Sequence, residues 1–329
     1  MSSKLIDSFG RTMNYLRLSI TDRCNLRCLY CMPSACSGKT TPNEVLRFEE
    51  MLRICRLLAG MGISTVRVTG GEPLMRKGAS EFIREVKKID GIARVNMTTN
   101  GMMLEEHLQN LADAGLDAVN ISLDTLNDER FRQLTGSEGM SAILPAIDRA
   151  LALGLTVKIN CVPMREFNEE DITRLALLAK DKKIGVRFIE LMPLGAAAAL
   201  QPLTIDEVTA LIEKTFGPLV PSSEKPGSGP AAYYTLAGFA GYIGIIGALS
   251  RRFCEDCNRI RITSEGILKP CLADDLGIDL RQILNDNASD SEIEKAVRDL
   301  AKKKPAGQNF TASGENAKFR MTEMLRIGG

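Results

Sequence analysis

Three cysteines lie close together near the N-terminus of the chain, at Cys24, Cys28 and Cys31. Thiolates are soft ligands, and three of them in one short segment can hold a metal ion or an iron–sulfur cluster. A structural zinc site would need a fourth ligand, for which Cys36 is the candidate, although zinc sites usually use cysteines in pairs. A four-iron cube held by three cysteines would instead leave one iron open, which is typical of a catalytic centre.

A second set of three cysteines, Cys254, Cys257 and Cys271, lies in the C-terminal third of the chain. A zinc ribbon would require another Cys-x2-Cys pair, and Cys271 stands alone. We therefore expect two clusters, each with an open iron, that face one another across a cavity. The remaining thiols are expected to be loop or core residues: Cys36, Cys55 and Cys161.

Charge and composition limit the partners of such a site. The chain has 329 residues, with 42 Lys and Arg against 41 Asp and Glu, so the formal net charge is only +1. A protein so close to neutral lacks the field that attracts nucleic acid or an anionic membrane, and neither is expected as a partner. No apolar run approaches the ~20 residues of a membrane helix, and the polar start does not resemble a signal peptide. We expect a cytoplasmic protein whose nine cysteines are mainly ligands, because cytosolic thiols stay reduced.

The only histidine is His107. One histidine excludes a multi-histidine metal site, and a histidine-dependent catalytic mechanism would depend on this residue alone. It lies in the charged stretch 105–109, which is typical of the solvated face of a helix. The charged stretch Glu292–Lys304 is likewise expected to be a solvated helix face.

Six β-branched segments alternate with helical patterns over the first part of the chain, and the clearest helix is predicted over Phe48–Gly60. Apolar residues alternate with polar ones along the strands, so that Leu16 and Leu18 face one way and Arg17 the other. Parallel strands covered by helices leave these polar faces no place except an inward, ligand-filled lumen. The predicted strands are Tyr15–Thr21, Thr65–Gly70, Arg94–Asn100, Ala118–Asp124, Thr156–Val162 and Val186–Met192.

We therefore predict an α/β protein in which residues 1–200 form an incomplete (βα)6 barrel of the TIM type. Ligands of such barrels bind at the carboxyl ends of the strands. Residues 201–329 are predicted to form a C-terminal α+β domain that carries the second iron–sulfur cluster. It would begin with a helix capped at Thr204, pass through a linker-like segment at 218–230, form strands at 233–236 and 242–249, and end in helices.

The motifs resemble those of a known superfamily. Cys24-x3-Cys28-x2-Cys31, Gly70-Gly71-Glu72-Pro73 and Asn120-Ile121-Ser122 are similar to motifs of the radical S-adenosylmethionine (SAM) superfamily. The second cysteine set with Asn258-Arg259-Ile260-Arg261, together with the terminal Gly328-Gly329, resembles the GTP 3′,8-cyclase family of molybdenum cofactor biosynthesis. The chain departs from that family at Arg251-Arg252, where a histidine is usual, and in the alanine-rich stretch 195–200.

The resemblance implies a reaction and its cofactors. In that family a 5′-deoxyadenosyl radical from SAM removes hydrogen from C3′ of the GTP ribose, and C3′ then bonds to C8 of guanine. The cofactors implied are SAM and two [4Fe–4S] clusters, held by the first and second cysteine sets. SAM contacts are implied at Tyr30, Gly71, Ser122 and Met192.

The resemblance also assigns the substrate residues. GTP contacts are implied at Arg17, Arg67, Thr98, Lys158, Arg259, Arg261 and the backbone of Ile260. Catalytic roles are implied for Arg17 and for Gly328 and Gly329. The two glycines could enter the site because they have no side chains. Four of these positions lie on the polar strand faces predicted above. Pairing of any one cation with a carboxylate such as Asp124 or Glu190 stays an alternative.

The partners implied are GTP, a flavodoxin- or ferredoxin-like electron donor and a downstream cyclic pyranopterin monophosphate synthase, with a homodimer as a further expectation. A second enzyme hypothesis is another radical SAM protein with an auxiliary cluster, for example one that modifies a peptide. A non-catalytic zinc protein, with Arg259 and Arg261 on its surface, is the alternative from another class.

Overall fold

One large sheet runs through the molecule. The computed structural model describes residues 4–31, 44–224, 226–227 and 229–308, and these include a 12-stranded sheet. In sheet order its strands are β12 (Ile278–Asp279), β11 (Ile267–Lys269), β10 (Arg259–Ile262), β1 (Tyr15–Ser19), β2 (Thr65–Thr69), β3 (Arg94–Thr99), β4 (Ala118–Ser122), β5 (Thr156–Cys161), β6 (Gly185–Ile189), β9 (Tyr242–Ile246), β8 (Ala232–Thr235) and β7 (Val220–Pro221). All pairs from β10 to β9 are parallel, and the pairs outside them are antiparallel.

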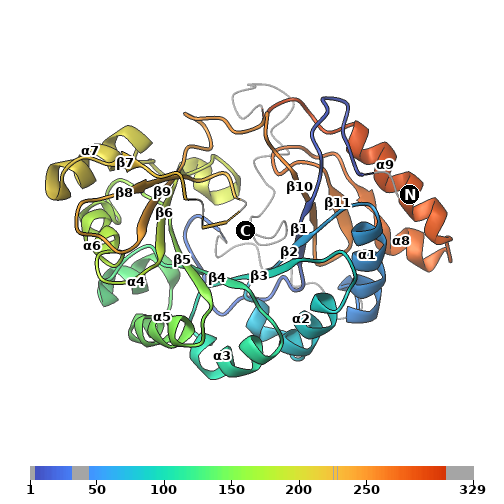
Figure 1. The fold of residues 1–329 in the computed structure, drawn as a ribbon, viewed down its shortest axis with the longest axis horizontal. Coiled ribbons are helices and arrows are strands. Elements are labelled where there is room, and N and C mark those ends of the chain that lie inside the picture. The colour runs from blue at the N-terminus through green and yellow to red at the C-terminus, as the bar shows by residue number, and fades with distance from the viewer. Residues whose placement is uncertain (1–3, 32–43, 225, 228, 309–329) are drawn as a thin grey trace.

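Helices connect the parallel strands, as the βα alternation predicts. Between β1 and β6 these helices are α1 (Phe48–Gly60), α2 (Ala79–Lys87), α3 (Leu104–Asp113), α4 (Asp128–Thr135), α5 (Ile143–Ala152) and α6 (Ile172–Leu177). Helix α7 (Ile205–Phe216) lies between β6 and β7, whereas α8 (Leu280–Asn285) and α9 (Asp290–Lys302) follow β12. The short 3-10 helices are η2 (Pro73–Met75), η3 (Met140–Ala142), η4 (Glu169–Asp171) and η5 (Gly195–Ala199). The sheet curves into an open arc, and the helices α1 to α6 lie on its outer side (Figure 1). The protein is thus an α/β fold with a large parallel sheet.

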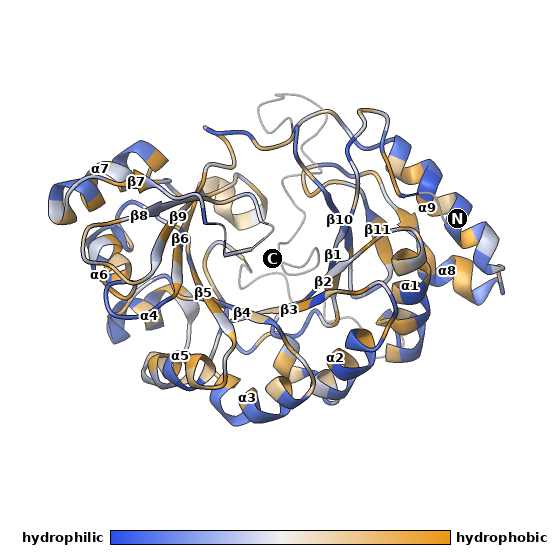
Figure 2. Cartoon of the chain, in the orientation of Figure 1, coloured by the Kyte–Doolittle hydropathy of each residue, from blue (hydrophilic) through white to orange (hydrophobic). Residues whose placement is uncertain are grey.

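The two faces of the sheet differ in polarity, as the alternation along the strands predicts. Leu16 and Leu18 on β1, like Val66 and Val68 on β2, are buried in the hydrophobic core. Helices on this side have one apolar and one polar face (Figure 2), and α1 buries Met51, Ile54 and Leu58. The opposite face is left to the polar residues.

The predicted elements are largely present, with shifted ends. Helix α1 has its predicted bounds, and Thr204 caps α7, where its hydroxyl accepts the Glu207 N–H at 3.2 Å. The predicted strands extend beyond the observed ones into the loops that follow them. The prediction missed β7, which lies inside the linker-like segment 218–230, and it missed β10, β11 and β12, because these short strands lie in and after the second cysteine set.

Two of the added strands change the extent of the parallel sheet. β9 pairs with β6 and β10 pairs with β1, so segments assigned by sequence to the C-terminal domain continue the same sheet on both sides. The division of the chain at residue 200 stays a prediction. Within the described ranges, the structure has no helix that is long and apolar enough to span a membrane.

Candidate active site

A cavity of about 1080 Å³ lies on the polar face of the sheet. Its wall contains side chains from β1 to β6 and from the loops that follow these strands. All six cysteines of the two predicted sets line it, namely Cys24, Cys28, Cys31, Cys254, Cys257 and Cys271. The structure therefore brings together two sets that are far apart in sequence.

The first cysteine set lies in the loop after β1. The Leu26 N–H approaches the Cys24 Sγ at 3.4 Å, and the Cys31 N–H donates to the Cys28 carbonyl at 3.0 Å. Burial raises the pKa of Cys24, and it raises the pKa of Cys28 well above the usual value. Thiols in this state need a positive centre to become thiolates, and metal coordination supplies one.

Tyr30, inside this loop, forms a hydrogen bond with the segment that follows β4. Its hydroxyl donates to Asp124 Oδ2 at 2.8 Å, while the Val162 N–H donates to Asp124 Oδ1 at 2.8 Å. Burial raises the pKa of Asp124 to about 6. One carboxylate therefore links the cysteine loop to the segments after β4 and β5.

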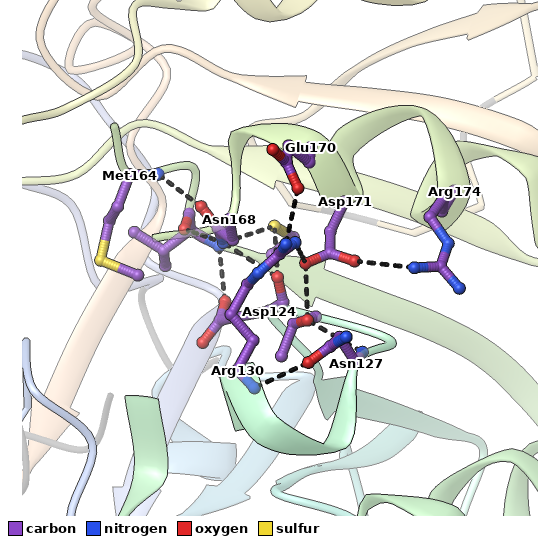
Figure 3. A network of polar contacts seen from close by, with 11 residues as sticks. Asp124, Asn127, Arg130, Met164, Asn168, Glu170, Asp171 and Arg174 are labelled. Carbon is purple, nitrogen blue, oxygen red and sulfur yellow. Dashed lines mark hydrogen bonds and ion pairs between the residues drawn. The ribbon is translucent and has the colours of Figure 1, made fainter. Parts of the chain in front are cut away.

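A buried polar network supports Asp124 from behind (Figure 3). The Asn168 side-chain amide donates to the Asp124 carbonyl at 2.9 Å and to the Val162 carbonyl at 3.0 Å. Next to it, Asp171 accepts from the Thr125 hydroxyl at 2.6 Å and from Arg130 at 2.7 Å. The sequence analysis missed this network, because Asn168 and Asp171 lie in a polar loop and only the fold shows that both are fully buried.

The second cysteine set lies in the segments before β10 and after β11. Cys257 N–H donates to the Cys254 carbonyl at 3.2 Å. Burial opposes ionisation of Cys257, but the charges of Lys304 and Arg259 lower its pKa overall. Burial raises the pKa of Cys271. Each set offers three thiols at the cavity wall, and this donor chemistry fits a [4Fe–4S] cluster with one open iron.

Buried cations line the same cavity as the cysteine sets. Arg261 on β10, Arg17 on β1 and Arg67 on β2 occupy one register row of the sheet. Burial, together with neighbouring cations, lowers the pKa of Arg17 well below its usual value and that of Arg261 to about 10. The same causes lower the pKa of Lys158 on β5 to about 7. Such a wall is set up to receive a polyanion.

The carboxylates suggested as alternative partners are engaged elsewhere. Asp124 binds Tyr30 and Val162, and Glu190 accepts the Leu249 N–H at 2.6 Å and the Ser250 N–H at 2.9 Å. Arg67 donates instead to the Met97 carbonyl at 3.2 Å and to Thr98 at 3.3 Å. Over the residues described, no ion pair joins Arg67 or Lys158 to a carboxylate.

The remaining predicted site residues fall into three groups. Thr98, Gly71, Ser122, Met192 and Arg259 line the cavity. Ile260 points its side chain into the core, so that only its backbone could meet a ligand. Gly328, Gly329 and Cys36 lie outside the described residues.

Glycine is required at one point of the cavity rim. Gly70 has φ +155°, and a Cβ there would lie 2.4 Å from the Thr21 carbonyl oxygen. The adjacent Gly71 N–H donates to the same carbonyl at 2.8 Å. The Gly-Gly pair thus holds the loop after β2 close to the loop after β1.

Two residues of the site were not among the predicted ones. Arg187 on β6 lines the cavity and donates to Asn160. Lys304 is 3% exposed, so the expectation that Glu292–Lys304 is only a solvated helix face is wrong at its last residue. Arg187 could have been found from its place in a strand, whereas Lys304 follows two other lysines and carries no such signal.

Known proteins resemble this chain over nearly its whole length. The family model of the radical SAM superfamily matches residues 18–179, and that of the molybdenum cofactor synthesis C-terminal region matches residues 184–310. A GTP 3′,8-cyclase of Heliobacterium modesticaldum is 44% identical, covering 99% of this chain and 100% of the relative. That of Thermodesulfovibrio yellowstonii is 42% identical, covering 92% and 95%.

A solved structure agrees in fold. The crystal structure of Streptococcus suis SuiB bound to S-adenosylmethionine superposes with a TM-score of 0.61 at 16% identity, covering 96% of this chain and 72% of that one. At this identity the likeness concerns the fold alone. The sequence relatives are decisive, and the chain belongs to the GTP 3′,8-cyclase family within the radical SAM superfamily.

Proposed function

We propose that this chain is a lyase that converts GTP into (8S)-3′,8-cyclo-7,8-dihydroguanosine 5′-triphosphate, the first step of molybdenum cofactor biosynthesis. The observation that carries the proposal is one cavity whose wall contains both three-cysteine sets and a row of buried cations. The full-length relatives named GTP 3′,8-cyclase support the same activity.

The two cysteine sets have separate roles in this proposal. Cys24, Cys28 and Cys31 would hold the cluster that binds SAM, and Cys254, Cys257 and Cys271 a second cluster. When bound, the first cluster and SAM supply the 5′-deoxyadenosyl radical that removes hydrogen from ribose C3′, so that C3′ can bond to guanine C8. SAM would lie against Tyr30, Gly71, Ser122 and Met192, which line the cavity.

The cations of the cavity would bind and orient GTP. Arg17, Arg67 and Lys158 would hold phosphate oxygens, with Thr98 beside Arg67, because arginine presents a planar pair of donors to phosphate and burial strengthens each contact. Burial and then the repulsion of neighbouring cations lower the pKa of Arg17, and the negative charge of a triphosphate would offset both. Arg259, Arg261 and the Ile260 backbone would hold the guanine end near the second cluster.

Finer features of the molecule belong to the same proposal. We take residues 1–200 as an incomplete (βα)6 barrel, which the curvature of the sheet supports (Figure 1), and residues 201–329 as an α+β domain with the second cluster. Gly328 and Gly329 would enter the site. The enzyme would act in the cytoplasm, as a homodimer, with a flavodoxin- or ferredoxin-like donor and a cyclic pyranopterin monophosphate synthase that uses its product.

Anaerobic reconstitution tests the function. The chain is loaded with iron and sulfide, its iron is counted, and SAM, a reductant and GTP are added. We expect about eight irons, from two four-iron cubes, and 5′-deoxyadenosine whose formation depends on GTP and is accompanied by the cyclised nucleotide. ATP in place of GTP is the control substrate.

The other outcomes separate the alternatives. About four irons, or SAM cleavage indifferent to GTP, would favour another radical SAM enzyme, such as a peptide-modifying one. Bound zinc without iron would contradict any radical SAM activity.

A further inference from the structure

Lys304 is a buried lysine just beyond α9 that contacts the second cysteine set. Its Nζ donates to the Arg259 carbonyl at 2.6 Å and to the Pro270 carbonyl at 2.7 Å. Its positive charge also lies close enough to the Cys257 and Cys271 thiols to interact with both. An ammonium group has three N–H donors, and the two carbonyls use two of them.

These contacts join the segments that carry the three cysteines. Arg259 follows Cys257 by two residues, and Pro270 directly precedes Cys271. The third cysteine is reached from the other side, because Arg11 donates to the Cys254 carbonyl at 2.7 Å.

Arg11 also fixes the backbone next to Lys304. It donates to the Pro305 carbonyl at 2.6 Å and to the Ala306 carbonyl at 3.0 Å, and it pairs with the buried Asp7 at 2.5 Å. Lys304 therefore cannot move away from the cysteines without breaking several buried hydrogen bonds.

The charge of Lys304 has no carboxylate partner among the residues that the structure describes. Burying an ammonium group without a negative charge nearby is costly, and two carbonyls offset only part of that cost. Thiolates of Cys257 and Cys271 bound to a cluster would supply the missing negative charge beside Lys304.

We propose that Lys304 is a positioning residue of the second cluster: its ammonium group holds the Cys257 and Cys271 segments together and gives the cluster a fixed, adjacent positive charge. This inference rests on the proposed function, which assigns a cluster to Cys254, Cys257 and Cys271. If a chemical reductant such as dithionite donated one electron to such a cluster, [4Fe–4S]2+ + e− → [4Fe–4S]+, the cluster would become more negative next to the lysine. A neutral residue at position 304 should therefore make reduction harder.

The test uses the full-length chain in which Cys24, Cys28 and Cys31 are replaced by alanine, so that only the second cluster can form. Lys304→Gln keeps a donor but not the charge, Lys304→Met removes both, and Lys304→Arg keeps the charge. Lys303→Met changes the exposed neighbour and is the matched control. Each protein is reconstituted anaerobically, its iron is counted, and the reduced cluster is followed by EPR during a redox titration.

We expect about four irons per chain and one shared midpoint potential in the parent, in Lys303→Met and in Lys304→Arg. In Lys304→Gln and Lys304→Met, the ratio of reduced to oxidised cluster at a fixed potential should fall at least about tenfold, which equals about 59 mV for one electron. Loss of more than half of the iron from both neutral variants, with Lys304→Arg retaining it, would support the same role. If Lys304 had only a structural role, the midpoint potential of the cluster would not depend on the charge of the residue at position 304.

Opposite results would overturn the inference. One such result is that Lys304→Gln keeps the parental iron content and a reduced-to-oxidised ratio within about threefold of the parent. The other is that Lys304→Arg loses iron as Lys304→Met does. If the neutral variants do not fold, as judged by circular dichroism, the iron content and potential of Lys304→Arg decide between these results. A parent chain that holds no iron would instead refute the second cluster of the proposed function, and the role of Lys304 with it.

Discussion

Glu72 allows a quantitative test of the site before any cofactor is added. This residue of the Gly-Gly-Glu-Pro motif is fully buried, and its carboxylate accepts the Asn100 N–H at 2.7 Å, the Leu74 N–H at 3.0 Å and the Thr99 hydroxyl at 2.9 Å. Burial outweighs these hydrogen bonds and raises the pKa of Glu72 from 4.5 to about 7.

A raised carboxyl pKa makes the folded chain less stable as the pH increases. The folded state binds the Glu72 proton more tightly than the unfolded state does, so this stabilisation is complete below pH 4.5 and is lost as the pH rises through about 7. The difference between the two values, 7 minus 4.5, corresponds to about 3 kcal/mol of free energy of unfolding at about 1.4 kcal/mol for each pKa unit.

Glu72→Gln removes the ionisable group and keeps a side chain of nearly the same shape. Urea unfolding of the iron-free, reduced chain is measured by circular dichroism from about pH 5 to about pH 8. The wild type should lose about 2 to 3 kcal/mol relative to Glu72→Gln over this range. Other titrating groups such as Asp124 affect both proteins equally and cancel in the difference.

The exposed Glu85 supplies the control, because Lys88 lowers its pKa instead of raising it. Glu85→Gln should show no relative gain in stability towards high pH. If the difference between wild type and Glu72→Gln stays constant within about 1 kcal/mol over the range, Glu72 does not titrate as its burial requires and the reasoning is refuted.

Three further perturbations test the cavity and its support. Arg17→Ala should abolish GTP cyclisation, measured by chromatography, while some SAM cleavage continues. Arg47→Ala, at an exposed residue, should change neither reaction. Normal GTP turnover by Arg17→Ala would contradict the assignment of Arg17 to the triphosphate. The pKa of Lys158 is lowered to about 7, so this residue loses its charge as the pH rises. The Kd for GTP should therefore increase about tenfold from about pH 6 to about pH 8. An equal increase in Lys158→Arg would exclude the titration of Lys158 as the cause. Asn168→Ala removes three hydrogen bonds in the interior and should lower the free energy of unfolding by about 2 to 4 kcal/mol. Glu170→Ala on the surface is the control and should change the free energy of unfolding little. A loss below about 1 kcal/mol in Asn168→Ala would show that the network does not support Asp124.

The alternation along strands predicted the cavity wall well, because side-chain parity survives an error in where a strand ends. Predicting Thr21 as part of the first strand is one such error, yet Arg17 faces the cavity and Leu18 the core, as expected. The same rule would have placed Arg261 beside Arg17 if β10 had been recognised. Its four residues begin two positions after Cys257, and the cysteine pair drew the interpretation towards ligands alone.

Burial that depends on distant segments could not be predicted in this way. Lys304 ends a run of three lysines and looks like part of a solvated face, since its acceptors on Arg259 and Pro270 come from other elements. Asn168 and Asp171 likewise lie in a charged loop. Local sequence patterns indicate which partners a residue can bind, whereas the tertiary structure determines which partners lie within contact distance.

The place of the second cysteine set follows from topology. β9 pairs with β6 and β10 pairs with β1, so the chain between β9 and β10 must pass from one end of the parallel run to the other. Cys254 and Cys257 lie in this crossing segment. Its first part is fixed where Glu190 accepts the Leu249 and Ser250 N–H groups, and its last part where the Asn258 carbonyl accepts the Asn14 N–H at 3.2 Å.

A segment fixed at both ends of the arc can face the first cysteine set only if the arc keeps its curvature. The distance between the two thiol sets is then a property of the whole parallel sheet, and not of either motif. This explains why each motif alone indicates a ligand set, while their meeting in one cavity with the row of cations depends on every strand pair from β10 to β9.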